Sequence, residues 1–309
     1  FLDWFSSEEA CLAYLEGLRW PQGFVCSACG VAQAAYRASR SRLMCSSCGH
    51  QATVTAGTIF EKTRTPLRVW LAAAWYLTNQ KQGVSALGLQ RVLGLGSYQT
   101  AWAMLHRLRH AMVRPDRERL KGQVEVDETY LALSDRHARA VAKPRKSNTS
   151  KALVAIAVET LQPHGFGRIR LRRIENDAAE SVIPFVQASV EPGAQVRTDG
   201  SAAYRSLSHL GYDHQKSVML GSDIPAHQSM PGVHRVASLV KRWILGTHHG
   251  AVQPEHLDAY LDEFVFRFNR RTSRSRGMLF YRLLQQAMAT EPVTYSDVVS
   301  TLSKTKKSR

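Results

Sequence analysis

Four of the five cysteines form two pairs whose spacing is typical of a metal site. Cys26 and Cys29 are separated by two residues, as are Cys45 and Cys48, and 15 residues lie between the pairs. Two such turns bring four thiolates into the tetrahedron that Zn²⁺ accepts, and the glycine after each pair allows the tight turn. Because four sulfurs leave no position open for water, the pattern predicts a structural zinc ribbon. Such a ribbon binds either nucleic acid or protein.

Two aspartates that follow apolar strand residues form a second candidate site. Asp127 ends the first predicted strand, after Val124 and Val126, and Asp199 ends the strand predicted for residues 195–198. At neighbouring strand ends the two carboxylates can share Mg²⁺, which prefers oxygen ligands. Two metal ions at such a site activate the attacking oxygen and stabilise the leaving oxygen of a phosphodiester. Each aspartate alone could be a cap or turn residue, but their matching positions favour catalysis.

A histidine is the candidate third ligand of that metal site. His234 follows Asp199 by 35 residues, and Lys241 comes seven residues later. Two helical turns place His234 and Lys241 on one face, about 10 Å apart along the axis. His234 can bind a metal, while Lys241 and Arg242 can bind DNA near it. Imidazole suits Mn²⁺ better than Mg²⁺, and the alternative for His234 is a residue that only starts the helix.

Three further charged residues share one face of an otherwise apolar helix. Glu263, Arg267 and Arg270 have the spacing i, i+4, i+7. Glu263 and Arg267 either pair with each other or brace the catalytic site, and Arg270 or Arg271 would then reach phosphate.

The order of predicted elements defines the fold that positions these residues. Alternating and continuous apolar patterns predict strands near 124–130, 151–159, 166–174, 195–198 and 215–219, with helices at 178–190 and 202–210 and from about 234 and 254. This order predicts an α/β fold, a ribonuclease-H-like catalytic core with a mixed five-stranded sheet. Its first three strands would form an antiparallel meander.

The region between the ribbon and this core is predicted to be helical. Its last two helices are joined by a turn at Gly94-Leu95-Gly96, which is the pattern of a helix-turn-helix motif. The second of them carries Arg107 and Arg109 and would face DNA. The alternative is a purely structural helical bundle.

The chain is strongly basic, with a net charge of +16 and a pI near 10. A basic chain could also be a ribosomal protein or a generally adhesive one. Because this charge accompanies the motifs above, it favours a protein whose partner is nucleic acid. A basic insert between the first two strands of the core contacts phosphate or is a solvated loop; its candidate residues are Arg139, Lys143, Arg145 and Lys146.

Other features bound the class of protein. No run of about 18 apolar residues is present, so we expect no membrane-spanning helix. The N-terminus lacks a basic leader, which argues against a signal peptide, and the missing Met suggests a trimmed start. Cys11 lies in an apolar helical stretch and is expected to be a buried structural thiol.

Taken together, these motifs resemble the DDE-type insertion-sequence transposases of bacteria, in the branch with a zinc ribbon and an ISXO2-like transposase domain. The resemblance covers about residues 5–285. It rests on the four cysteines, on Val-Asp-Glu-Thr-Tyr around Asp127, on Thr-Asp-Gly around Asp199, and on segments 234–243, 246–250 and 266–271.

The resemblance implies dependence on Mg²⁺ or Mn²⁺, cleavage that frees 3′-OH ends at terminal inverted repeats, and attack of those ends on target DNA. It implies catalytic roles for Asp127 and Asp199, with His234 where the family usually has Glu or Asn. Lys241 matches the basic residue seven positions further on, and the downstream motif matches Glu263, Arg267 and Arg270. The partners implied are double-stranded DNA and further copies of the chain, in the cytoplasm near the bacterial nucleoid.

We therefore expect four parts: an N-terminal helix and zinc ribbon at 1–62, a helical DNA-binding region at 63–118, a catalytic domain at 119–290, and a disordered basic tail at 291–309. Two other functions fit the same motifs. One is a DNA-binding regulator that has lost catalysis, and the other is a ribonuclease-H-like nuclease without strand transfer.

Overall fold

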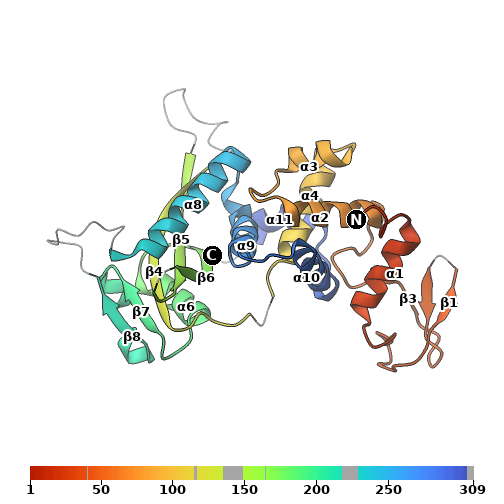
Figure 1. The fold of residues 1–309 in the computed structure, drawn as a ribbon, viewed down its shortest axis with the longest axis horizontal. Coiled ribbons are helices and arrows are strands. Elements are labelled where there is room, and N and C mark those ends of the chain that lie inside the picture. Colours follow the sequence, from red (N-terminus) through yellow and green to blue (C-terminus); the bar gives the residue numbers. More distant parts are fainter. Residues whose placement is uncertain (40, 115–116, 135–148, 164, 218–228, 305–309) are drawn as a thin grey trace. The chain divides into compact units, whose positions relative to one another are not determined.

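The computed structural model describes residues 1–39, 41–114, 117–134, 149–163, 165–217 and 229–304 (Figure 1). The chain forms two compact units. The first comprises Phe1–Arg114 and Ser273–Arg309, and the second comprises Pro115–Thr272.

The second unit is built on a five-stranded mixed sheet. Its strands are β4 (Gln123–Ser134), β5 (Thr149–Thr160), β6 (Phe166–Ile174), β7 (Gln195–Thr198) and β8 (Asp213–Lys216), in the order β6-β5-β4-β7-β8. The first three strands are antiparallel neighbours, whereas β4 pairs with β7, and β7 with β8, in parallel. This is the predicted ribonuclease-H-like α/β arrangement.

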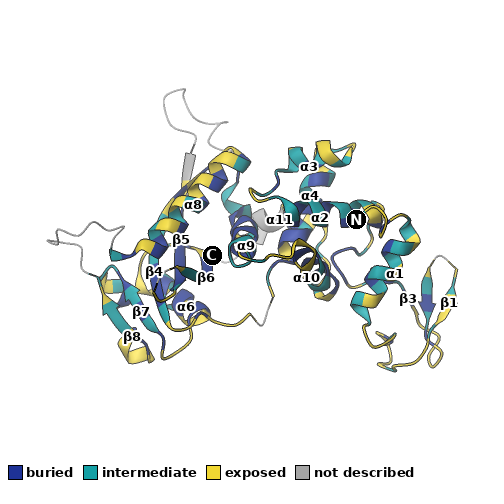
Figure 2. Cartoon of the chain, viewed as in Figure 1, coloured by how far each residue is buried: buried dark blue, intermediate teal, exposed yellow. Residues whose placement is uncertain are grey.

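Helices cover both faces of the sheet. Helices α8 (Pro231–His248) and α9 (Leu257–Phe268) pack on one face, and α6 (Ala179–Ser189) with the short turn η1 (Ala202–Tyr204) packs on the other. Strand β5 is buried from residue 152 to 159, as its continuous apolar run predicted (Figure 2). A sheet covered on both sides needs apolar side chains on both faces of its central strands.

One predicted helix of this unit is wrong in type. Residues 202–210 form two 3₁₀ turns, η1 and η2 (Ser208–Leu210), rather than one α-helix. Gly211, at φ +86°, ends η2 and turns the chain into β8, which begins at Asp213 rather than near residue 215.

The first unit combines a small sheet with helices. Helix α1 (Glu8–Arg19) precedes an antiparallel sheet of β1 (Tyr36–Ala38), β2 (Arg42–Met44) and β3 (Gln51–Ala52). The helices α2 (Leu67–Asn79), α3 (Ala86–Leu93) and α4 (Tyr98–His110) follow. Gly94, in the left-handed region, ends α3 before α4 begins, as the helix-turn-helix pattern predicted.

Helix α10 (Arg276–Ala289) packs on α1 and α2, within the first unit. Phe280 lies in an aromatic cluster with Phe1, Phe5, Tyr14 and Trp75. The expected catalytic domain ended at residue 290, so this packing differs from that division. The burial of the α10 aromatic side chain among N-terminal rings explains the difference.

The tail was expected to be disordered from residue 291, and this is corrected for residues 295–304, which form helix α11 (Tyr295–Lys304). Thr294 and Asp297 form a reciprocal cap, because the Asp297 N–H donates to Thr294 Oγ1 and the Thr294 N–H donates to Asp297 Oδ2. Val298 is buried. Residues 305–309 lie outside the described part.

No described helix combines the length and apolar character needed to cross a membrane.

Candidate functional site

The four predicted zinc ligands converge in the first unit. Cys26 Sγ lies 3.7 Å from Cys48 Sγ, Cys29 Sγ lies 3.7 Å from Cys45 Sγ, and all four sulfurs are within 4.8 Å of one another. A tetrahedral ion with metal–sulfur bonds of about 2.3 Å requires sulfur–sulfur distances of about 3.8 Å. The observed distances fit this geometry.

Each pair of cysteines lies in the same type of tight turn. The Gly30 N–H donates to the Cys26 carbonyl at 2.9 Å, and the Gly49 N–H donates to the Cys45 carbonyl at 3.0 Å. Both glycines have positive φ, +73° and +71°, as the sequence predicted. Backbone N–H groups of Cys29 and Ala28 also hold the pKa of Cys26 down, at about 6, which favours the thiolate.

The two candidate catalytic aspartates lie at the same level of adjacent parallel strands. Glu125 of β4 is paired in register with Arg197 of β7. Asp127 and Asp199 each follow that pair by two residues, so their side chains leave the same face of the sheet. Parallel strands are about 4.8 Å apart, which places the two carboxylates as neighbours.

The electrostatics of Asp127 are those of a carboxylate close to a like charge. Burial raises the pKa of Asp127, the N–H of Glu128 opposes this rise by donating to Asp127 Oδ1 at 2.8 Å, and the Asp199 carboxylate raises the pKa further. A bound cation would relieve both the desolvation and the repulsion. This pair therefore has the charge arrangement of a cation site.

The candidate third ligand His234 lies in the first turn of α8. It is close enough to Asp127 to lower the pKa of that carboxyl group, against the larger effect of burial. His234 Nε2 is buried and makes no hydrogen bond within the described residues. Within that part of the chain, however, only the four cysteines converge closely enough for three or more ligands to share one ion. Lys241 and Arg242 are exposed further along α8.

Sequence reasoning missed Glu125, which attaches α8 to the sheet. Glu125 is 3 % exposed, and its Oε2 accepts the Val233 N–H at 3.0 Å. Burial raises the pKa of Glu125, and the N–H groups of Val233 and Gly232 oppose that rise. A carboxylate at the positive end of the helix dipole is stabilising. Glu125 thus fixes the helix turn that carries His234.

A second missed residue is Glu128, on the opposite face of β4 from Asp127. The buried Tyr204 hydroxyl donates a hydrogen bond to Glu128 Oε1. Burial raises the pKa of Glu128 to about 7; the Tyr204 hydrogen bond opposes this rise and the Asp127 and Asp199 carboxylates add to it. The pair attaches the turn after Asp199 to the strand that carries Asp127, and so helps to align the two aspartates.

The downstream charged set on α9 has mainly internal partners. Glu263 is fully buried, with Arg267 Nη1 3.8 Å from its Oε1. The guanidinium of Arg270 lies 4.0 Å over the Phe266 ring and donates to the Phe266 carbonyl. Arg271 donates to the carbonyls of Gly167 and Phe166 at the edge of β6. These contacts favour the pairing alternative and the anchoring of α9 over direct phosphate binding.

The predicted DNA-contacting arginines of α4 separate into two environments. Arg109 is 1 % exposed, so its assignment to the DNA-binding surface is corrected. It follows the buried Ala101 and Leu105 at intervals of four residues, which places it on the core face of the helix. Arg107 is half-buried and lines a pocket. The basic insert lies outside the described residues; its members are Arg139, Lys143, Arg145 and Lys146.

The capping role of Glu125 can be tested through stability. We expect Glu125→Ala to lower the free energy of unfolding by about 1–3 kcal/mol, because the α8 N–H groups lose a buried acceptor. Glu125→Gln keeps a carbonyl acceptor and should lose less. Urea unfolding followed by circular dichroism measures the change, with the exposed Glu175→Ala as the control. Equal stability of Glu125→Ala and the control would contradict the capping account.

Comparison with known protein families identifies two matching segments of the chain. Residues 119–269 match the ISXO2-like transposase domain, and residues 6–51 match the transposase zinc-ribbon domain. The chain is 26% identical over 278 residues to an uncharacterized protein in transposable element ISH50 of Halobacterium salinarum, which covers 85% of this chain and 91% of that protein. The chain therefore carries a transposase zinc-ribbon domain followed by an ISXO2-like transposase domain.

Proposed function

We propose that the chain binds the terminal inverted repeats of an insertion sequence, cleaves the DNA to free 3′-OH ends, and joins these ends to target DNA. The observation that carries this proposal is the alignment of Asp127 on β4 with Asp199, which directly follows β7, beside the first turn of α8. The match of residues 119–269 to the ISXO2-like transposase domain agrees with it.

The donor atoms of these residues are of the kinds that a divalent cation binds, although the three side chains do not converge on one point in this structure. Asp127 and Asp199 supply carboxylate oxygens, and His234 supplies a buried ring nitrogen that lacks a hydrogen-bond partner in the described chain. When bound, Mg²⁺ or Mn²⁺ would activate the attacking oxygen and neutralise charge on the phosphate. The imidazole nitrogen favours Mn²⁺ in this donor set.

Both reactions of the proposal are displacements at phosphorus. In cleavage, a water oxygen bonds to phosphorus, the bond to the 3′ oxygen breaks, and that oxygen leaves as a 3′-OH after taking a proton. In joining, the freed 3′-OH attacks a target phosphodiester in the same way. The exposed Lys241 and Arg242 on α8 would bind the backbone phosphates beside the reacting group. Several copies of the chain would act together on the two element ends.

The aspartates are tested by a strand-joining assay with element-end DNA, target DNA and Mn²⁺. Asp127→Ala and Asp199→Ala should each reduce joined product by about a thousandfold or more, because the stabilisation of the reacting oxygens is lost. The exposed Asp213→Ala on β8 is the matched control and should retain activity.

If the wild-type protein binds the element ends but never nicks them, the alternative function of a DNA-binding regulator that has lost catalysis holds instead. If it nicks the ends but never joins them to target DNA, the chain is a nuclease without strand transfer.

His234 is tested by the metal preference of cleavage. His234→Glu supplies an oxygen ligand, so the ratio of the rate in Mg²⁺ to the rate in Mn²⁺ should rise. The exposed His209→Glu is the control and should leave this ratio unchanged. An unchanged ratio in His234→Glu would argue against ligation by His234.

We also propose that the four cysteines hold structural Zn²⁺. Purified protein should contain about one zinc ion per chain, measured by plasma mass spectrometry. Cys29→Ser should lose this ion and unfold the ribbon, since zinc binding supplies the folding free energy of such a module. Cys11→Ala removes a buried thiol outside the cluster and should keep the ion. Full zinc content in Cys29→Ser would contradict the assignment.

A further inference from the structure

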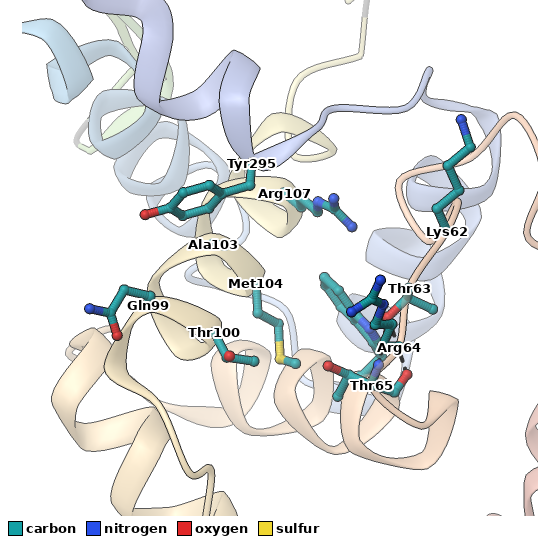
Figure 3. Close-up of a pocket in the computed structure, with 11 residues that line it drawn as sticks. Lys62, Thr63, Arg64, Thr65, Gln99, Thr100, Ala103, Met104, Arg107 and Tyr295 are labelled. Atoms are coloured by element: carbon teal, nitrogen blue, oxygen red, sulfur yellow. Dashed lines mark hydrogen bonds between the residues drawn. The ribbon is translucent and has the colours of Figure 1, made fainter.

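We propose that a basic pocket in the first unit binds a backbone phosphate of DNA beside the helix-turn-helix motif. The pocket has a volume of about 360 Å³ and lies between α4 and the loop that precedes α2 (Figure 3). This inference rests on the proposed function, which requires that the chain bind element ends, and it names one site through which the first unit does so.

The walls of the pocket come from four segments of one unit, one of which contributes only Trp70 of α2. Gln99, Ala103 and Arg107 face it from α4 at intervals of four residues, which places them on one helical stripe. The loop 62–65 forms the opposite side, and Tyr295 of α11 also lines the pocket (Figure 3). Segments that are far apart in the sequence thus meet around one cavity.

The pocket is cationic. Its lining includes Lys62, Arg64 and Arg107, and none of its 11 lining residues is acidic. Lys62 and Arg64 are exposed, although Lys62 Nζ also lies 3.4 Å from the Glu61 carboxylate. Three positive groups around a cavity select an anion, and guanidinium groups match the geometry of phosphate oxygens.

Arg107 brings a half-buried guanidinium to the pocket. Its Nε is shielded from solvent, and its Nη1 reaches the Ile59 carbonyl only at 3.4 Å, a long hydrogen bond. An anion in the pocket would therefore meet the terminal nitrogens of this guanidinium, whose charge strengthens hydrogen bonds to phosphate.

The loop that carries the other two cations has a fixed shape. Thr63 Oγ1 accepts the indole N–H of the buried Trp70 at 2.8 Å and the backbone N–H of Thr65 at 3.1 Å. Lys62 has a positive φ of +53°, which is uncommon for a residue with a side chain. These contacts therefore hold the backbone that carries Lys62 and Arg64 in one conformation before any ligand arrives, which reduces the entropy that the loop loses on binding.

The position of the pocket favours the DNA backbone over a free anion. In helix-turn-helix proteins the second helix enters the major groove, where its N-terminal residues meet base edges and neighbouring groups contact phosphates. Here α4 is that second helix, and Gln99 and Thr100 of its first turn line the same pocket as the cations. A phosphate in the pocket would therefore lie beside the groove that α4 enters.

The test measures DNA affinity in full-length protein that carries Asp127→Ala, so that the DNA is not cut. Fluorescence anisotropy gives the dissociation constant for an element-end duplex at several salt concentrations. The double variant Lys62→Ala/Arg64→Ala should bind about tenfold more weakly, and the slope of log affinity against log salt should fall by about 0.9, the value for one phosphate. Arg107→Gln should also weaken binding, and its thermal melting reports whether it folds.

The matched control is Arg282→Ala, which removes an exposed cation of α10 outside the pocket and should leave the salt slope within about 0.5 of the parent value. A second measurement locates the phosphate. Duplexes with one neutral methylphosphonate at each position in turn should show one position that weakens the parent protein but not the double variant. Equal salt slopes, or equal methylphosphonate profiles, in parent and double variant would overturn the proposal.

Two further outcomes separate the possible sources of the anion and the two proposals. Phosphorus NMR line broadening of inorganic phosphate that depends on Lys62 and Arg64, with unchanged DNA affinity, would show a free-anion site and overturn the DNA assignment. If DNA affinity depends on Lys62 and Arg64 but the wild-type protein never joins strands, the phosphate site holds and the proposed function is refuted. If the wild-type protein joins strands but its DNA affinity does not depend on Lys62 and Arg64, the proposed function holds and the phosphate site is refuted.

Discussion

The parallel pairing of β4 with β7 is the interaction on which the candidate catalytic centre depends. It aligns Val124 with Val196, and both side chains are buried against the α6 face of the sheet. A slip of one residue would expose one of these valines and move Asp199 to the opposite face from Asp127. The apolar packing on one face therefore determines the alignment of carboxylates on the other.

The same strand also fixes the helix that completes the centre. Glu125 and Asp127 leave β4 on one face, two residues apart, and Glu125 accepts the first N–H groups of α8. Gly232 permits the close approach, because a Cβ there would lie 2.8 Å from Glu125 Oε2. A buried carboxylate thus positions His234 through the backbone of α8. Asp127, two residues after Glu125 on the same face of β4, is not used for this attachment and can take part in the proposed chemistry.

Local patterns in the sequence predicted the cysteine turns, the succession of strands along the chain and the strand ends at which Asp127 and Asp199 stand, because each depends on residue types within one segment. Contacts between distant segments were not predictable in this way. Glu125 meets Val233 108 residues later, and Glu128 meets Tyr204 76 residues later. Arg109 was assigned to the surface by its charge, whereas the helical period that it shares with Ala101 and Leu105 places it in the core. Residue type misled there, and position along the helix would have corrected it.

Helix α1 couples the two halves of the first unit through its ends. At its start, Glu8 Oε1 accepts the Leu67 N–H at 2.6 Å and so caps α2. At its end, Arg19 Nη1 donates to the carbonyls of Thr53 and Val54, where the chain leaves the ribbon. The loop with Lys62 and Arg64 lies between these two attachment points in the sequence. Its position therefore depends on the ribbon as well as on α2, so a zinc ion held by the four cysteines would also contribute to the geometry of the basic pocket.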